Sequence, residues 1–280
     1  MDTPTQPTAI PVLPPRRISR RLAILVVLVA FAVLVAWALG TPPGVLGKAD
    51  AIAYAICHRI ESRTFNIDAD TLMPLCARCT GIYLGVMISY LVAVAARRSR
   101  VGNLPPRSVI AVLLLFVGIM GFDGVNSYLH LFPGVTGLYE PNNVLRLVTG
   151  MGCGLALFNL VFPVFNSMAW QAPDQGRPIE NLRELLSLCA VAVIVILIVL
   201  SDRPVFMWVF GVVSTLGVIL MLTMIGTVLF LSFTRLHQSV QRWRDLAIPL
   251  LAGLTLAFIE IGAIDILRFA LTQTWAGFKL

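Results

Sequence analysis

Charged residues are scarce in this chain. Lys, Arg, Asp and Glu make up 12% of its 280 residues, whereas 58% are hydrophobic. A soluble domain carries charge at about a quarter of its positions. The shortage excludes a soluble enzyme, a disordered tail protein and a small secreted disulfide scaffold. The chain also lacks an internal repeat, which argues against a transporter built from two related halves.

The uncharged parts of the chain are long runs of apolar residues. About 20 consecutive apolar residues are enough to cross a bilayer. We predict an all-α fold, a polytopic transmembrane helical bundle of about seven spans, with one domain over residues 22–280. Residues 1–21 are rich in Pro, Thr and then Arg, so they are predicted to form a disordered basic tail. The predicted spans cover residues 22–39, 81–96, 108–128, 143–165, 185–200, 204–233 and 247–269.

Basic residues predict how the bundle is oriented. The formal net charge is +7, and Arg residues concentrate in the tail and in alternate connections between the spans. Because positive loops are retained in the cytoplasm, the N-terminus is predicted to be cytoplasmic and the C-terminus to lie outside. The expected location is the plasma (inner) membrane and the expected partner is the lipid bilayer; nucleic acid is not an expected partner.

The predicted outer loop at residues 41–80 carries the sharpest motif. Cys57 and His58 are followed by Cys76 and Cys79, which stand in C-x-x-C spacing. Thiolate and imidazole are good zinc ligands, and a C-x-x-C turn brings two sulfurs to one tetrahedral ion. We therefore predict a zinc site at Cys57, Cys76 and Cys79, completed by His58 or by the more distant His130.

Two other interpretations of the cysteines stay open. A disulfide between Cys57 and either Cys76 or Cys79 is compatible with the oxidising outer side of a bacterial membrane. A redox-active pair is the other, since C-x-x-C thiols often have a lowered pKa. A c-type haem site is disfavoured, because Thr80 stands where that motif requires His.

Polar residues at the outer end of the third predicted span form a second candidate site. Asp123, Asn126 and His130 are spaced i, i+3, i+7 and would share one helical face. An acid inside a span is costly and usually faces a partner or a wet cavity. Alternatively, Gly121 and Gly124 end the helix, and Asp123 is then a solvated boundary residue.

The start of the fourth predicted span adds Glu140 and Arg146 to this site. Arg146 would lie near the first turn of the helix, on the outer side. It could pair with Asp123 or Glu140, or bind an anionic lipid head group. The alternative is ordinary snorkelling of an arginine toward the interface.

The last span contains Glu260, Asp265 and Arg268. Asp265 and Arg268 are one turn apart and are predicted to neutralise each other. Glu260 lies deeper, so it is either a functional acid or a protonated carboxyl bonded to a neighbouring helix. Cys153 and Cys189 lie in apolar spans and are predicted to pack as small hydrophobic residues.

The cysteine block resembles a known signature. The segments CHRIESRTF and PLCARCTGIYLG within residues 57–85 are similar to those of an uncharacterised prokaryotic family of predicted membrane proteins. The Asp123-Gly124 step and the N-x-L-R-x-x-T-G stretch at residues 143–150 are similar to two weaker motifs of that family. A proline that the family pattern places before Arg63 is absent here, so the local turn is expected to differ. The resemblance implies a membrane protein and no assigned activity.

Three functions remain as predictions. The first is a metal site over a polar intramembrane cluster that acts on a lipid-linked or anionic substrate; three cysteines favour a structural ion, since catalytic zinc keeps an open position. The second is a membrane thiol–disulfide oxidoreductase that uses Cys76 and Cys79, and the third is a non-catalytic subunit of a membrane complex. The candidate catalytic residues of the first function are Asp123, Asn126, His130, Glu140 and Arg146.

Overall fold

The structure is a computed structural model that describes residues 18–132, 134 and 137–277. The predicted tail at residues 1–21 lies outside these residues except for its last four. The described part of the chain is helical, with two short 3-10 turns, η1 (Glu61–Arg63) and η2 (Trp243–Leu246). Its α-helices are α1 (Arg20–Gly40), α2 (Gly44–Ile56), α3 (Ala77–Ala95), α4 (Arg107–Leu129), α5 (Asn143–Ala169), α6 (Leu182–Val199), α7 (Pro204–Phe233) and α8 (Ala247–Thr272).

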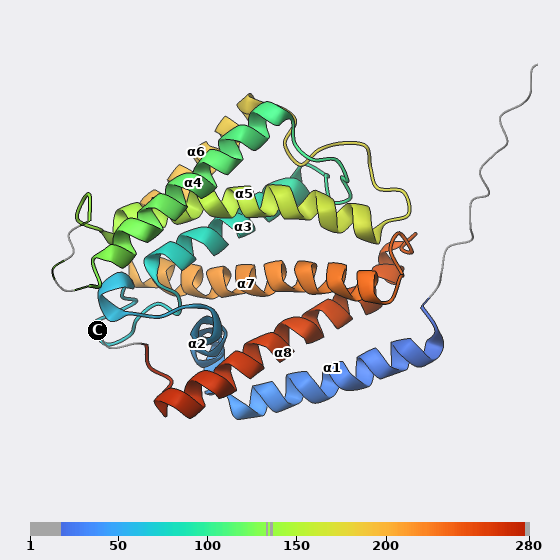
Figure 1. The fold of residues 1–280 in the computed structure, drawn as a ribbon, viewed down its shortest axis with the longest axis horizontal. Coiled ribbons are helices and arrows are strands. Elements are labelled where there is room, and N and C mark those ends of the chain that lie inside the picture. Colours follow the sequence, from blue (N-terminus) through green and yellow to red (C-terminus); the bar gives the residue numbers. More distant parts are fainter. Residues whose placement is uncertain (1–17, 133, 135–136, 278–280) are drawn as a thin grey trace, which may run out of the picture.

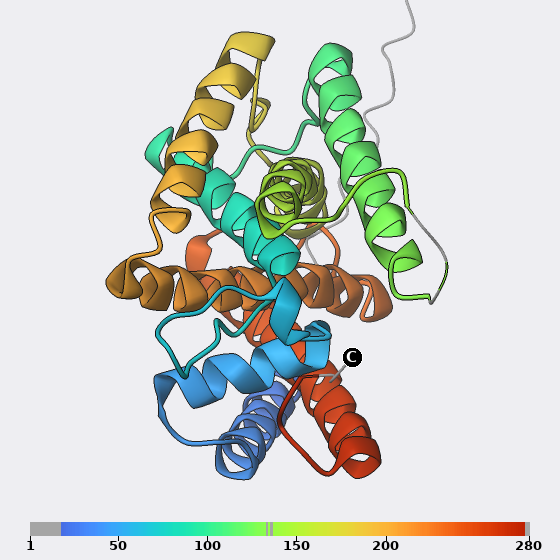
Figure 2. The same cartoon turned by 90° about the vertical axis from the view of Figure 1, so that its left-hand side faces the viewer.

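The predicted seven spans are confirmed as helices. Within the described residues, every α-helix except α2 is long and apolar enough to cross a membrane. Figure 1 shows these helices running in the same general direction, with α1 and α8 along one side of the molecule. Seen end-on in Figure 2, α5 lies in the middle, with α3, α4, α6 and α7 around it. The apolar stretch of α5 is accordingly the most buried of the seven, and that of α1 the least.

Glycines bring α3 and α5 unusually close together. Gly81 and Gly85 on α3 face Gly150 and Gly154 on α5, and each pair has the small-xxx-small spacing that lets membrane helices approach. A Cβ added at Gly154 would lie 1.8 Å from the carbonyl oxygen of Ile82. The crossing therefore tolerates no side chain at that position, and it fixes the start of α3 against α5.

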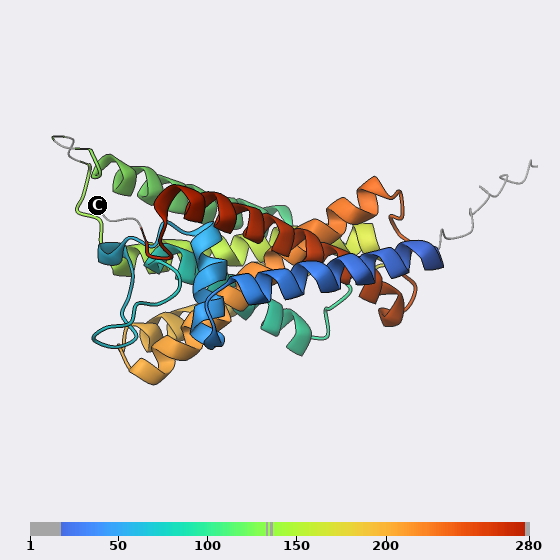
Figure 3. The same cartoon turned by 90° about the horizontal axis from the view of Figure 1, so that it is seen from below.

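The helix α2 connects α1 to the cysteine loop, and in Figure 3 it lies across the bundle rather than along it. This short helix begins at Gly44 and ends at Ile56, inside the loop predicted over residues 41–80. Cys57 follows as an extended residue with φ −124° and ψ 143°. Cys57 and His58 therefore lie outside the helix, and the directions of their side chains are not fixed by the helical spacing.

The opposite end of the bundle is tied together by short contacts between loops. Arg98 and Glu184 form an ion pair at 2.6 Å, and isolated bridges join Val101 to Asp174 and Trp170 to Val240. This end carries the connections that the basic residues predict to be cytoplasmic, and the end that carries Cys57, Cys76 and Cys79 is called the cysteine end below.

Candidate metal centre

Three cysteines from two segments meet at the cysteine end. Cys57 follows α2, Cys76 immediately precedes α3, and Cys79 lies in the first turn of α3. Their sulfur atoms all lie within 4.8 Å of one another. Cys57 and Cys76 are buried and Cys79 is half-buried, and none of the three is in a disulfide. The convergence that the sequence predicted is therefore present.

Backbone geometry directs donors at the Cys57 sulfur. Arg59 adopts a left-handed conformation with φ 52°, which turns the chain so that its backbone N–H donates to Cys57 Sγ at 3.5 Å. The N–H of Cys76 donates to the same sulfur at 3.4 Å. Hydrogen bonds from the thiols of Cys76 and Cys79 hold the pKa of Cys57 well below its usual range. A negatively charged sulfur with two backbone donors suits a metal cation in place of the thiol protons.

Arg268 of α8 fixes the end of α2 beneath this cluster. Its guanidinium donates to the carbonyl oxygens of Tyr54 and Cys57, and to that of His58 at 3.3 Å. It also lies 4.0 Å from the centre of the Tyr54 ring. The last carbonyls of a helix have no partner within the helix, so a cation supplied by α8 stabilises the geometry that presents Cys57.

His58 lies between the sulfurs and a group of arginines. It is not among the ligand atoms that lie mutually within 4.8 Å in the described residues. Its Nδ1 accepts the backbone N–H of Ile60 at 3.0 Å, so the proton of the neutral ring is on Nε2, which is a donor. Burial lowers the pKa of His58, and the charges of three arginines act in the same direction, so the ring is neutral near pH 7. These arginines are Arg63, Arg78 and Arg146.

Asp123 is the centre of a polar cluster next to the sulfurs. Its side chain is 2% exposed and forms an ion pair with the guanidinium of Arg78. The Tyr139 hydroxyl donates to its other oxygen at 2.8 Å. Arg78 also donates to the hydroxyl of Ser127 at 3.0 Å. Burial and the bond to Asp123 raise the pKa of Tyr139 to about 12, so its hydroxyl remains a donor at neutral pH.

The helix α4 continues through Gly121 and Gly124 to Leu129, so Asp123 and Asn126 share a buried face as expected. The amide of Asn126 donates to the carbonyl of Tyr139 at 2.9 Å and accepts from the N–H of Leu138 at 2.7 Å. The Nδ1 atom of His130 lies 2.9 Å from the Asn126 carbonyl. Asn126 therefore holds Leu138 and Tyr139 against α4, whereas His130 bonds back to the carbonyl of its own helix.

The two remaining predicted residues have different surroundings. Glu140 is exposed, whereas Arg146 is buried in the first turn of α5. Arg146 donates to Asn143 Oδ1 at 2.8 Å, and no ion pair joins it to Asp123 or Glu140 among the described residues. Its Nε is buried and has no partner in that part of the chain. Arg63 donates to the carbonyl of Ser127 at 3.0 Å.

Sequence reasoning missed Arg63 and Arg78 at this end of the bundle, and it considered Arg268 only as a partner of Asp265. Arg78 pairs with Asp123, Arg63 reaches the same region, and Arg268 holds the α2 carbonyls. For Arg78 a signal existed, because it stands inside the C-A-R-C turn at the start of a helix. For Arg63 and Arg268 no local pattern indicates the long-range partner.

The other singled-out residues lie apart from the cluster. Glu260 is exposed on the surface of α8. Asp265 accepts a hydrogen bond from the Trp37 indole at 3.3 Å, and an ion pair of Asp265 with Arg268 is not among those of the described residues. Cys153 is buried and Cys189 is half-buried, and both are free thiols.

Comparison with known proteins matches the segment of the chain that carries most of these residues. A family model described as predicted membrane protein (DUF2085) matches residues 57–160. An uncharacterized protein of Methanothermobacter thermautotrophicus is 34% identical over 102 residues, which are 36% of this chain and 80% of that protein. An uncharacterized protein of Methanocaldococcus jannaschii is 28% identical over 121 residues, which are 43% of this chain and 70% of that protein.

No solved structure matches the chain. The matched residues include the three cysteines, Asp123 and Arg146, and they end within α5. On the strength of the family match and the extent of the alignment with the Methanothermobacter protein, the chain belongs to this family of predicted membrane proteins.

Proposed function

We propose that this membrane protein binds zinc through Cys57, Cys76 and Cys79, and that the arginines beside the ion bind the anionic head group of a lipid or lipid-linked substrate. The single observation that carries the proposal is the convergence of three sulfurs from two segments within 4.8 Å. The proposed setting is the plasma (inner) membrane, with the cysteine end facing outward.

The donor set favours zinc among common ions. Zinc accepts thiolates at about 2.3 Å in tetrahedral geometry, so sulfurs that share one ion lie somewhat closer than 4.8 Å. Small rotations of the three side chains are enough to reach that arrangement. The proposed fourth ligand is a nitrogen of His58. Because Nδ1 accepts the Ile60 N–H, the proton of the neutral ring is on Nε2, so zinc binding requires that Nδ1 gives up this hydrogen bond. Three thiolates are typical of structural zinc, so the ion would hold the loop against the start of α3.

The excess of positive charge favours an anion next to the metal. Arg63, Arg78 and Arg146 all act on the electrostatics of His58, whereas Asp123 is the acid that pairs with one of them. Arg78 is committed to that acid. Arg63 and Arg146 therefore supply the free donors, and arginine is the preferred residue for bidentate binding of phosphate or carboxylate.

Asp123 is less suited to proton transfer than the sequence suggested. It accepts from both Arg78 and Tyr139, so both of its oxygens are already engaged in hydrogen bonds. In the proposed function Asp123 is a positioning residue that orients Arg78. The proposed function is therefore binding of an anionic lipid-linked molecule at a site that zinc holds together. His130, whose Nδ1 contacts the Asn126 carbonyl, remains the candidate general base.

Metal analysis of the detergent-purified protein tests the zinc part. We expect about one zinc per chain, with loss of most of it in Cys57→Ser or Cys79→Ser. Cys153→Ser and Cys189→Ser are matched controls that should keep the metal, because both cysteines lie outside the cluster. Absence of metal together with a disulfide in the untreated protein would refute this part and support the thiol oxidoreductase.

A melting-temperature measurement in nanodiscs tests the proposed anion binding separately. In nanodiscs, a lipid monophosphate should raise the melting temperature of the zinc-loaded protein, whereas its neutral alcohol analogue should not. Arg146→Gln should remove the shift, and Arg107→Gln, exposed at the opposite end, should retain it. A shift of equal size in both variants would show that the arginines at the cysteine end do not form the site.

A further inference from the structure

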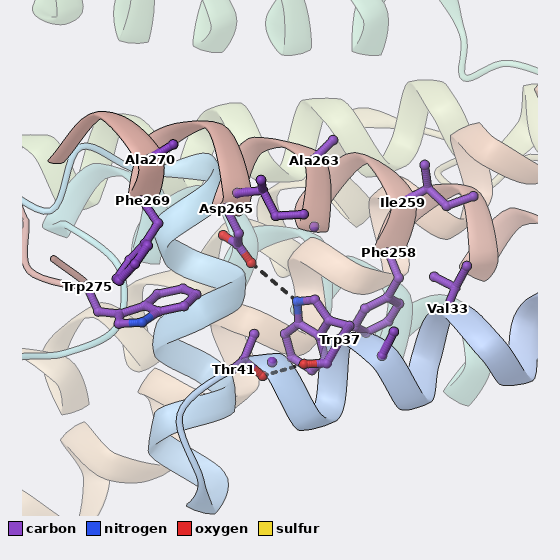
Figure 4. A pocket seen from close by; sticks show the side chains of 14 residues that line it. Val33, Trp37, Thr41, Phe258, Ile259, Ala263, Asp265, Phe269, Ala270 and Trp275 are labelled. Atoms are coloured by element: carbon purple, nitrogen blue, oxygen red, sulfur yellow. Dashed lines mark hydrogen bonds between the residues drawn. The ribbon is translucent and has the colours of Figure 1, made fainter. Parts of the chain in front are cut away.

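A cavity of about 680 Å³ lies between α1 and α8, apart from the cysteines and their arginines. Its wall is largely apolar, and Figure 4 shows the carboxylate of one acid between two aromatic pairs. Trp37 and Phe258 form one pair, with ring centres 4.8 Å apart. Phe269 and Trp275 form the other, at 5.4 Å. The acid is Asp265.

Small residues leave this space empty. A Cβ added at Gly40 would meet no atom within 4 Å, and one at Gly262 would meet only a Trp37 carbon, at 3.8 Å. Ala36 and Ala263 also line the wall. The side chains of α1 and α8 therefore leave the cavity between these helices unfilled. The α3–α5 crossing, in contrast, leaves no space for an added side chain.

One carboxylate oxygen of Asp265 in this wall has no partner among the described residues. Asp265 is 3% exposed, and its Oδ2 accepts the indole N–H of Trp37 at 3.3 Å. Its Oδ1 is buried and has no hydrogen bond to any described residue. A buried carboxylate oxygen without a partner is costly, and a small rotation of this side chain toward the cavity would let a ligand supply the missing bond.

We propose that this cavity binds a single-chain amphiphile whose head group is a hydroxyl, with the hydroxyl on Asp265 Oδ1 and the chain along the apolar wall. A hydroxyl matches this oxygen in either protonation state, because it both donates and accepts. The wall runs on α8 from Phe258 to Ala270, which is about 18 Å at 1.5 Å per residue. That length is close to half of a hydrocarbon core of about 30 Å, so the ligand lies within the leaflet at the cysteine end.

Photolabelling of the full chain in nanodiscs tests the proposal. The probes are a long-chain fatty alcohol with a diazirine in mid-chain, the same chain ending in a methyl group, and the same chain ending in an amine. We expect the alcohol to label peptides of α1 and α8 about tenfold more than the methyl-ended chain, the usual effect of one buried hydrogen bond. Excess unlabelled alcohol should compete.

Variants assign the label to the cavity and to the carboxylate. Asp265→Leu should remove the preference for the alcohol, and Asp265→Asn, which still offers a polar partner, should keep most of it. Ala263→Phe should block all probes, and Glu260→Gln, an exposed acid on the same helix, should change nothing. Melting curves establish that each variant is folded.

Three results would overturn the proposal. Equal labelling by the alcohol and the methyl-ended chain in the unmodified protein would mean that the cavity holds ordinary bilayer lipid. Amine labelling above alcohol labelling, lost in Asp265→Asn, would assign a cationic ligand instead. Labels spread evenly over all lipid-facing helices would mean that no site exists. Because the cavity lies outside the metal and arginine residues, each of these results leaves the proposed function unaffected.

Discussion

Substitution of Asp123 by Asn should destabilise the protein strongly, because it leaves the guanidinium of Arg78 without its counter-charge. The Asp123 side chain is 2% exposed and that of Arg78 is 17% exposed. Removing one partner of a buried ion pair costs about 3–5 kcal/mol. Since Arg78 retains some contact with solvent, we expect the lower end, about 3 kcal/mol.

Thermal unfolding in a mild detergent measures this cost. At about 2–4 °C per kcal/mol for a chain of this size, the melting temperature should fall by roughly 6–12 °C. The matched control is Glu140→Gln, an exposed carboxyl at the same end, which should change the melting temperature by less than about 2 °C.

A double-mutant cycle shows whether the cost comes from this pair. Arg78→Gln alone leaves the Asp123 carboxylate buried without its cation. Combining it with Asp123→Asn should therefore lose less than the sum of the single variants, by roughly 2 kcal/mol. Additive losses, or an Asp123→Asn protein as stable as the unmodified one, would refute the ion pair as the centre of the cluster.

Three further predictions concern other contacts. Gly154→Ala should lower stability by about 1–3 kcal/mol through overpacking, measured as a lower melting temperature. The control Gly152→Ala, whose Cβ would meet only the Phe116 side chain, should have a smaller effect. Equal effects of the two substitutions would contradict the close approach of α3 and α5 at Gly154. Arg98→Gln should cost at most about 1 kcal/mol, because its ion pair with Glu184 is partly exposed; a larger loss in the same assay would be inconsistent with this. Arg268→Leu should accelerate zinc loss to a chelator several-fold by releasing the end of α2, and an unchanged release rate would argue against this positioning role.

The sequence predicts the helices well for a physical reason. A membrane-spanning helix must be apolar over its whole length, because the bilayer offers no hydrogen bonds to side chains or backbone. The amino-acid sequence alone therefore identifies each such helix. The α3–α5 crossing also left a signal in its paired glycines, Gly81 with Gly85 and Gly150 with Gly154, which the reading by hydropathy overlooked. Hydropathy measures burial in lipid and is blind to how closely two helices approach.

The site was only partly predictable. The C-x-x-C spacing and the shared loop indicated that Cys57, Cys76 and Cys79 would meet, because a short turn constrains two of the three sulfurs. The partner of Asp123 was not predictable in the same way. Arg78 lies 45 residues away in sequence, and which of several arginines reaches the acid depends on the packing of α3 against α4 and α5. Arg268 is still more distant from Cys57, at 211 residues.

X-ray absorption at the zinc edge of the purified, unlabelled protein tests the central claim most directly, because it reports the atoms bound to the metal. We predict three sulfur neighbours at about 2.3 Å and one nitrogen or oxygen at about 2.0–2.1 Å, with one sulfur fewer around the residual zinc of Cys57→Ser. A first shell made only of nitrogen and oxygen, or zinc whose shell is unchanged in Cys57→Ser, would contradict the claim that the loop cysteine and the α3 cysteines hold one ion.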